Sequence, residues 1–155
     1  MKYPFLILIV AALFLCYRAY ETAFKKNSDF AKGELSIFRQ SGGVPVMLDI
    51  QIADNISKRA QGLMDVKKLG KNSGMLFIYD NEESRKMWMK NTIIPLDMMF
   101  IDSGKNILGV KENAVPLSEE IIYSANPALY VLETNGGFIK ENDIKPGDKI
   151  EFKVK

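Results

Sequence analysis

The chain has 155 residues, the length of one ordinary domain. Hydrophobic residues make up 47% and charged residues 26%, which is typical of a globular protein and excludes a disordered one. The net charge of +2 is uneven, because residues 1–26 hold four basic residues and one acidic residue and leave 17 basic and 18 acidic residues to the remainder. Because this remainder has no basic excess, its charge argues against nucleic acid as a partner.

The N-terminus predicts export. Lys2 precedes an apolar run over residues 4–17 and Arg18 ends it, which is the layout of a secretory signal. As a helix this run would span roughly 21 Å, short of the ~30 Å hydrocarbon core of a bilayer. We therefore expect residues 1–20 to be a signal peptide or a membrane anchor that contacts the membrane through residues 4–17. The rest of the chain would then be periplasmic or otherwise extracytoplasmic.

Cysteine and histidine usage limits the chemistry that the chain can perform. Cys16 is the only cysteine and the chain has no histidine. A lipid anchor on Cys16 and a buried helix are alternatives to a signal peptide in this segment. In an exported protein the part of the chain after residue 20 would contain no thiol and hence no disulfide. The usual general base near neutral pH is missing, so acid–base work would fall to carboxylates, lysine or tyrosine.

The body of the protein is expected to follow a connector. Residues 21–43 are polar and rich in turn formers, which predicts a linker, with a short "LSIF" that favours the start of a first strand. A β-rich domain is expected over residues 44–155. It opens with "VPVMLDIQIA", in which apolar and polar residues alternate as in a half-buried strand. Asp54 or Asn55 can cap a short helix after this strand, and Gly62 would end it.

The remainder of the body is predicted as short strands separated by turns. The expected strands are "GMLFIYD" (74–80), "RKMWMK" (85–90), "DMMFID" (97–102), "ILGVKEN" (107–113), "ALYVLET" (128–134) and "KIEFKV" (149–154). A short helix is expected in "GFIKEN", and "KPGD" favours a type II turn with Gly147 at its third position. This pattern predicts a mainly β (α+β) fold: a compact, barrel-like, mostly antiparallel sheet with one or two short helices, preceded by an N-terminal apolar helix.

A series of motifs carries a resemblance to a known family. In chain order they are "RAQGLM" (59–64), "SGMLFIY" (73–79), "MWMKNTIIPLDMMFID" (87–102), "AVP" (114–116), "YVLETNGG" (130–137) and "IKPGD" (144–148). Over about residues 44–154 the chain resembles the domain of unknown function 192 family. The resemblance implies a compact β-rich, barrel-like fold, often preceded by a signal or an anchor, and it implies no established reaction. Family members often carry a basic residue where this chain has Val66.

The stretch "RKMWMKNTIIPLDMMFID", residues 85–102, contains the main candidate site. If "KMWMK" is extended, Trp88 and Lys90 share one face and place an aromatic plate beside a cation. Pro95 lacks a backbone donor and ends this segment. The chain is then expected to turn, so that Asp97 lies near the start of the next strand.

These residues favour a site for a small polar ligand, such as a sugar or a carboxylated metabolite. Residues from other motifs would complete its rim with a second cation and a second carboxylate. The predicted ligand-binding residues are Arg59, Trp88, Lys90, Asn91, Asp97 and Glu133. The predicted function is therefore that of an exported, membrane-associated binding or accessory module.

Two other functional classes remain open at this level, and whether the protein is an enzyme is undecided. Asp97 and Glu133 would suit the carboxylate pair of a hydrolase acting on envelope polysaccharide. In a purely structural or interaction module, Trp88 and the methionines would instead fill a core. Asn91 and Asp97 would then satisfy a tight loop, and Lys90 would form a salt bridge with Asp97 or Glu133.

Methionine content raises the question of metal binding. Seven of the eight methionines lie in the body, and thioethers are soft ligands for Cu(I). Methionine is also an ordinary gap filler in apolar cores, and most of these positions lie in strand-like apolar runs. No loop has the oxygen-ligand spacing of a calcium site. The sequence therefore predicts neither a metal nor a cofactor.

Overall fold

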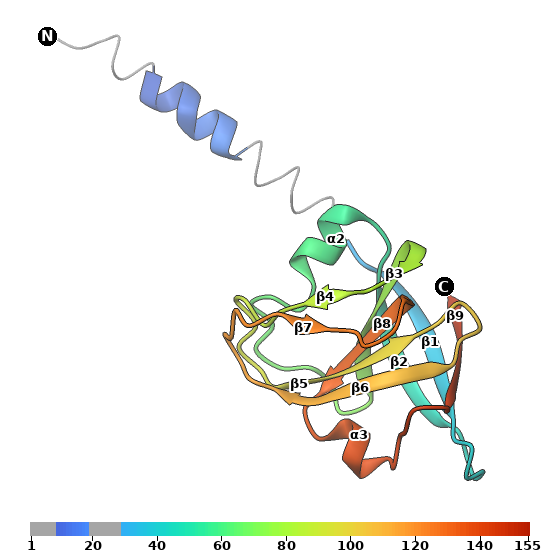
Figure 1. Cartoon of the computed structure of the whole chain (residues 1–155). Coiled ribbons are helices and arrows are strands. Elements are labelled where there is room, and N and C mark those ends of the chain that lie inside the picture. Colours follow the sequence, from blue (N-terminus) through green and yellow to red (C-terminus); the bar gives the residue numbers. More distant parts are fainter. Residues whose placement is uncertain (1–8, 19–28) are drawn as a thin grey trace, which may run out of the picture.

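The computed structural model describes residues 9–18 and 29–155 (Figure 1). Residues 9–18 are helical. The elements of the body are β1 (Ala31–Phe38), β2 (Val46–Ala53), α2 (Ile56–Gln61), β3 (Ser73–Glu83), β4 (Lys86–Met87), β5 (Leu96–Ile101), β6 (Ile107–Ala114), β7 (Ile122–Tyr123), β8 (Ala128–Asn135), α3 (Phe138–Glu141) and β9 (Lys149–Val154). The prediction of a mostly β fold with a few short helices is confirmed.

Seven strands form one sheet in the order β6-β5-β8-β3-β2-β1-β9, and β4 and β7 form a second, two-stranded sheet. Neighbours in the large sheet are antiparallel except β2 and β3, which run parallel. The expected barrel is wrong, because the large sheet is not closed. In the described part of the chain, its outer strands are linked at one end by an isolated bridge between Asn106 and Lys149 and by a few backbone hydrogen bonds, such as that from Ile150 N–H to the carbonyl of Lys105, but by no ladder. Closure would need a continuous ladder between the outer strands.

The sheet begins earlier than the expected start of the body near residue 44. β1 lies within the segment predicted as a linker, and it pairs with β2 on one side and β9 on the other. Leu35 and Ile37 of β1 are fully buried. Both belong to the "LSIF" that favoured a strand start, and the sheet extends this strand back to Ala31 because both of its edges are paired.

Residues 9–18 of the predicted signal peptide or anchor belong to the described part of the chain. Among the described residues, no helix is both long and apolar enough to cross a membrane. Residues 1–8 and 19–20 of the predicted signal peptide or anchor lie outside the described residues.

Local signals place the short helix and a turn where the sequence predicted them. The side chain of Asn55 accepts a hydrogen bond of 2.9 Å from the backbone N–H of Lys58 and caps α2. Gly62 ends α2 with a φ of 48°. In the "KPGD" turn, Gly147 has a φ of 97°, the left-handed value that the third position of a type II turn requires.

The predicted strand over residues 85–90 is much shorter in the structure. Only Lys86 and Met87 form β4, which pairs with β7, a strand that the sequence did not predict. The chain leaves the extended conformation at Asn91, where φ is 55°. A backbone hydrogen bond of 3.0 Å from Thr92 N–H to the carbonyl of Met89 closes this turn.

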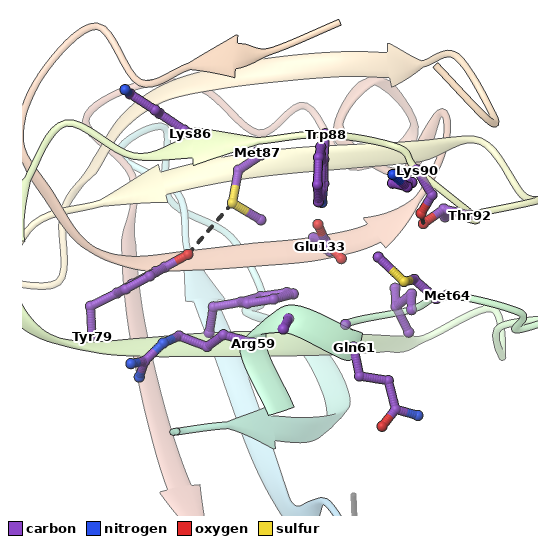
Figure 2. Close-up of a pocket in the computed structure, with 14 residues that line it drawn as sticks. Arg59, Gln61, Met64, Tyr79, Lys86, Met87, Trp88, Lys90, Thr92 and Glu133 are labelled. Carbon is purple, nitrogen blue, oxygen red and sulfur yellow. Dashed lines mark hydrogen bonds between the residues drawn. The ribbon is translucent and has the colours of Figure 1, made fainter. Parts of the chain in front are cut away.

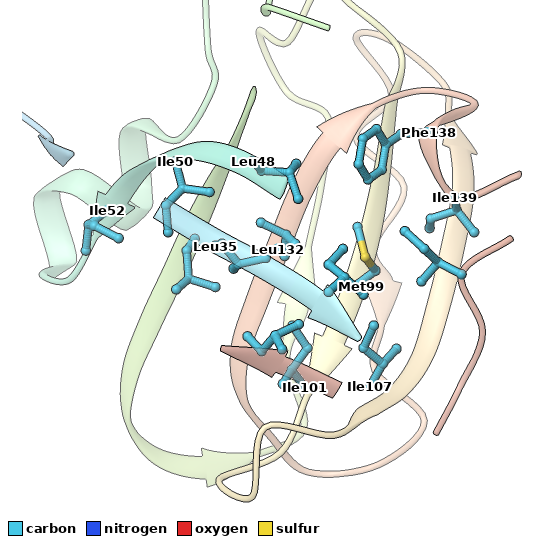
Figure 3. Close-up of a cluster of buried hydrophobic side chains, with 14 residues drawn as sticks. Leu35, Leu48, Ile50, Ile52, Met99, Ile101, Ile107, Leu132, Phe138 and Ile139 are labelled. Atoms are coloured by element: carbon cyan, nitrogen blue, oxygen red, sulfur yellow. The ribbon is translucent and has the colours of Figure 1, made fainter. Parts of the chain in front are cut away.

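Alternation along the strands divides the core into two clusters on opposite faces of the large sheet. The first cluster is closed by α3 (Figure 3) and contains Leu35, Ile37, Leu48, Ile50, Ile52, Leu76, Met99, Ile101, Ile107, Leu132, Phe138, Ile139, Ile144 and Ile150. The second contains Ala53, Leu63, Met75, Phe77, Met87, Met89, Leu96, Met98, Phe100, Ala114, Ala128 and Val131. Because side chains alternate along a strand, Glu133 faces the second cluster with Val131.

Candidate functional site

A small pocket of about 80 Å³ opens over the second cluster, between β4 and α2 (Figure 2). Its lining comes from α2 and the turn after it, from β3, from β4 and the residues that follow it, and from β8. The lining residues are Arg59, Ala60, Gln61, Gly62, Leu63, Met64, Phe77, Tyr79, Lys86, Met87, Trp88, Lys90, Thr92 and Glu133.

Glu133 supplies the polar floor of this pocket. It is directly opposite Met75 on β3 and Met98 on β5, both fully buried, and its own exposure is 4%. Burial among apolar neighbours raises the pKa of Glu133 to about 8. Within the described residues its carboxyl group has no hydrogen bond and no ion pair. At neutral pH the floor therefore holds a carboxylic acid, with one O–H donor and a free acceptor.

Trp88 covers this acid. Figure 2 shows the indole ring above the carboxyl group of Glu133. The residue is 44% exposed, so it forms a lid between pocket and solvent and does not fill the core. The Lys90 ammonium lies 5.3 Å from the centroid of the indole ring and 3.8 Å from the carboxylate of Glu119. Lys90 therefore pairs with Glu119, while the structural alternative placed it against Asp97 or Glu133.

Arg59 forms a fixed cationic wall. Its Nη1 donates a hydrogen bond of 2.7 Å to the carbonyl of Ile78, and its guanidinium carbon lies 5.0 Å from the centroid of the Tyr79 ring. The Tyr79 hydroxyl donates to Met87 Sδ over 3.6 Å. Burial raises the pKa of Tyr79, so this hydroxyl stays protonated at neutral pH.

The lining carries three cationic side chains, two of which are paired: Arg59 lies 3.8 Å from the carboxylate of Asp80 and Lys90 lies 3.8 Å from that of Glu119. Arg59, Lys86 and Lys90 are cationic, and Glu133 is the acidic residue of the described lining. Because burial raises the pKa of Glu133 to about 8, the cations face a neutral acid at pH 7. The pocket is therefore suited to a group that carries negative charge or accepts hydrogen bonds.

Four of the six predicted site residues line the pocket: Arg59, Trp88, Lys90 and Glu133. Asn91 does not belong to the lining. Its backbone carbonyl accepts a hydrogen bond of 3.0 Å from the N–H of Asp65, and its side-chain amide lies 3.9 Å from Met64 Sδ. Asn91 therefore supports the turn beside the pocket.

Asp97 also lies away from the pocket. It is fully buried, with Oδ1 accepting a hydrogen bond of 2.8 Å from the N–H of Asn113 and Oδ2 accepting one of 2.8 Å from the N–H of Ile139. In the register of β5 and β8, Asp97 is opposite Thr134, one residue beyond Glu133. The two carboxyl groups thus project from opposite faces of the sheet and do not form the pair that a hydrolase would need.

Several pocket residues were not predicted, among them Tyr79, Lys86 and Met87. The alternation in "GMLFIYD" places Met75, Phe77 and Tyr79 on one face of a strand, which is the signal that was available. It does not reveal that this face lies beside Glu133, because β3 and β8 are far apart in the chain.

The methionines mostly pack. Met75, Met87, Met89, Met98 and Met99 are buried in the two clusters. Across residues 9–18 and 29–155, no group of three or more histidine, cysteine, aspartate or glutamate side chains is arranged to hold a metal ion.

The fold and the pocket define a β-rich protein with a small, positively lined cavity. The chain belongs to the domain of unknown function 192 family, described as "Uncharacterized ACR", whose sequence pattern matches residues 37–152. The resemblance drawn from the sequence motifs is thus confirmed. Among curated proteins, none matches the chain.

Two crystal structures resemble this one over most of their length. A protein of Sinorhizobium meliloti 1021, described as a candidate transcription regulator, is 42% identical with a TM-score of 0.77; the match covers 79% of this chain and 95% of that chain. A protein of unknown function from Novosphingobium aromaticivorans DSM 12444 is 36% identical with a TM-score of 0.73, covering 76% and 83% respectively.

Proposed function

We propose that the protein is a binding module for a small polar ligand, such as a sugar or a carboxylated metabolite, whose polar end enters the pocket between β4 and α2. One observation carries the proposal: the buried carboxyl of Glu133 lines this pocket and has no partner among the described residues. The Glu133 oxygens are not among the sealed polar atoms of the described residues, so they are reached from the pocket. A ligand group that hydrogen-bonds Glu133 can therefore take the place of water on them.

The lid supports the same function. Trp88 is half-exposed and lies over the carboxyl group of Glu133. Its ring therefore offers an apolar surface to a ligand that hydrogen-bonds Glu133. A few placed polar groups beside aromatic and apolar side chains are the usual composition of a ligand site. We retain, as part of this proposal, the exported and membrane-associated location that residues 1–20 predict.

Two other functions have less support. The hydrolase would need Asp97 and Glu133 together, but the two side chains face opposite sides of the sheet. Transcription regulation, the role named in the description of the Sinorhizobium protein, would need a basic surface if it acted through binding to nucleic acid. The chain beyond residue 26 has 17 basic and 18 acidic residues.

Thermal unfolding and tryptophan fluorescence can test the proposal at pH 7 with a panel of sugars and small carboxylated metabolites. Trp88 is the only tryptophan, so any change in emission reports on this pocket. We expect one class of ligand to raise Tm, because binding should add about 2.7 kcal/mol to the free energy of unfolding at a hundred times Kd. The same ligand should shift the Trp88 emission in a saturable way without forming a product.

Two variants make this test specific. Glu133→Leu fills the floor with an apolar side chain and should abolish both responses, while Lys140→Ala, an exposed change on α3, should leave both intact. If no sugar or carboxylated metabolite changes Tm or fluorescence, the pocket is only a packing feature and the structural alternative stands.

A further inference from the structure

The pocket has room for the polar end of a ligand and not for a whole molecule. Its volume is about 80 Å³. A water molecule occupies roughly 30 Å³ in the liquid, and pockets that enclose whole small molecules measure about 300–1,000 Å³. A head group of about three non-hydrogen atoms therefore fits, and the rest of the ligand lies outside the pocket.

The floor of the pocket presents a hydrogen-bond donor and an acceptor side by side. Glu133 is buried opposite Met75 and Met98, and within the described residues its carboxyl group has no hydrogen bond and no ion pair. Burial raises its pKa to about 8, so at pH 7 one oxygen carries a proton and donates while the other accepts. A primary carboxamide carries the matching pair, because its carbonyl accepts and its N–H donates from the same edge of one plane.

The cations of the lining already have partners of their own. Arg59 lies 3.8 Å from the carboxylate of Asp80, and Lys90 lies 3.8 Å from that of Glu119. The Lys86 ammonium lies 5.8 Å from the centroid of an aromatic ring on β7. A carboxylate head group would therefore give up its hydration without gaining a cation of its own, which favours an uncharged acceptor.

The walls between the floor and the mouth of the pocket are mostly apolar. Leu63, Phe77 and Met87 line the pocket and are buried, and the indole ring of Trp88 lies over the carboxyl group of Glu133 (Figure 2). A head group with several hydroxyls would bury some of them without partners, whereas a carboxamide places its carbonyl and one N–H on the acid. The walls thus favour a ligand with one compact polar group.

We infer that the pocket binds an uncharged primary carboxamide, whose carbonyl accepts from the Glu133 O–H and whose N–H donates to the second oxygen of the same carboxyl group. This inference rests on the proposed function and narrows it to one class of ligand. A trans secondary amide, such as a peptide bond, does not fit, because its N–H and its carbonyl point in opposite directions. The inference accounts together for the small volume, the paired cations and the apolar walls.

Ionisation of the floor should weaken the binding of a carboxamide. The titratable groups that line the pocket around Glu133 come from α2, β3, β4 and the residues after β4, and they are Arg59, Tyr79, Lys86 and Lys90. The neighbouring strand β5 contributes a methionine. The arginine and the lysines stay charged, and the raised pKa of Tyr79 keeps its hydroxyl neutral. Above the Glu133 pKa of about 8 the O–H donor is lost and the amide carbonyl faces a carboxylate oxygen, so affinity should fall as pH rises from 7 to 9.

The experiment compares butanamide with N-methylbutanamide, butanoate and butylamine as ligands of the full chain, followed by Trp88 fluorescence at pH 7 and pH 9. We expect butanamide to bind roughly tenfold more tightly at pH 7 than each of the other three compounds. It should bind roughly tenfold more weakly at pH 9, in proportion to the protonated fraction of Glu133. N-methylbutanamide is the matched control, because it keeps a donor and an acceptor but holds them trans.

Two variants assign the binding to the floor of the pocket. Glu133→Gln keeps a donor and an acceptor, so it should bind butanamide at pH 7 and lose the pH dependence. Glu133→Leu removes both groups and should abolish the response.

The outcomes separate this inference from the proposed function. Equal binding of butanamide and N-methylbutanamide, butanamide binding that Glu133→Leu leaves intact, or equal butanamide binding at pH 7 and pH 9 would overturn the inference. A response to butanoate or to a sugar with none to butanamide would also overturn it, while leaving the proposed polar-ligand function in place. No response to any of the four compounds, nor to the wider panel of sugars and carboxylated metabolites, would overturn both.

Discussion

Asp97 and Glu133 are buried carboxyl groups on neighbouring strands, one register step apart, yet they have opposite surroundings. Asp97 receives two backbone N–H groups, from Asn113 and Ile139, and thereby joins β5 to the end of β6 and to α3. Glu133 faces the other side of the sheet, where Met75 and Met98 flank it and an open pocket lies above it. The comparison shows that burial alone does not give two carboxyl groups the same role; the number of protein donors distinguishes the one that joins parts of the fold from the one that stays open to the pocket.

The largest effect is expected from Glu133→Gln at high pH. Burial raises the pKa of Glu133 from 4.5 to about 8, so the folded protein holds a proton that the unfolded chain releases between these values. The stability tied to this proton is complete below pH 4.5 and is lost as pH rises through 8, by roughly 4–5 kcal/mol in all. Glutamine cannot ionise, so the variant should match the native protein at pH 4 and exceed it at pH 9.

Urea unfolding at pH 4, 7 and 9 measures this difference in the free energy of unfolding. If the difference in the free energy of unfolding between variant and native protein stays constant over this range, Glu133 does not hold a proton at neutral pH, and the contrast with Asp97 fails.

The same isosteric change at Asp97 should have the opposite sign. Asp97→Asn replaces one carboxylate oxygen by an amide group, which cannot accept, so a buried backbone N–H loses its partner. Loss of a hydrogen bond to a charged group, together with a buried N–H left without an acceptor, should lower the free energy of unfolding by about 3 kcal/mol. Urea unfolding at pH 7 measures the loss, with the exposed Asp143→Asn as the control that should change little. A neutral result at Asp97 would show that its two hydrogen bonds do not hold the fold.

A smaller effect should follow from moving the floor of the pocket without changing its chemistry. A Cβ added at Gly74 would lie 2.6 Å from the backbone oxygen of Glu133, so Gly74→Ala must push β8 away from β3. Such overpacking should cost about 2 kcal/mol and shift the Trp88 emission. Gly109→Ala on β6 is the matched control, because a Cβ there meets nothing within 4 Å and should change stability little. Equal results for the two glycines would contradict the close β3–β8 contact.

The strand periodicity of the sequence predicted much of the fold and part of the site. The segments that became β5, β8 and β9 were placed within a residue or two, and the cap residues Asn55 and Gly62 were identified. The short β4, the unpredicted β7 and the open sheet were not foreseen. Each of these depends on which segments pair across the molecule, and a two-residue strand has too little periodicity of its own to be recognised.

The sequence by itself determined the face on which each strand residue lies, because side chains alternate with a period of two whatever the neighbours are. It therefore placed Glu133 on the same face as Val131, and the register of Glu133 opposite Met75 and Met98 of the second cluster confirms this. Only the tertiary structure decided what each carboxyl group would meet there. The donors to Asp97 are 16 and 42 residues away in the chain, and the methionines beside Glu133 come from two other strands. Such register between distant segments is set by packing of the whole sheet, which no local pattern encodes.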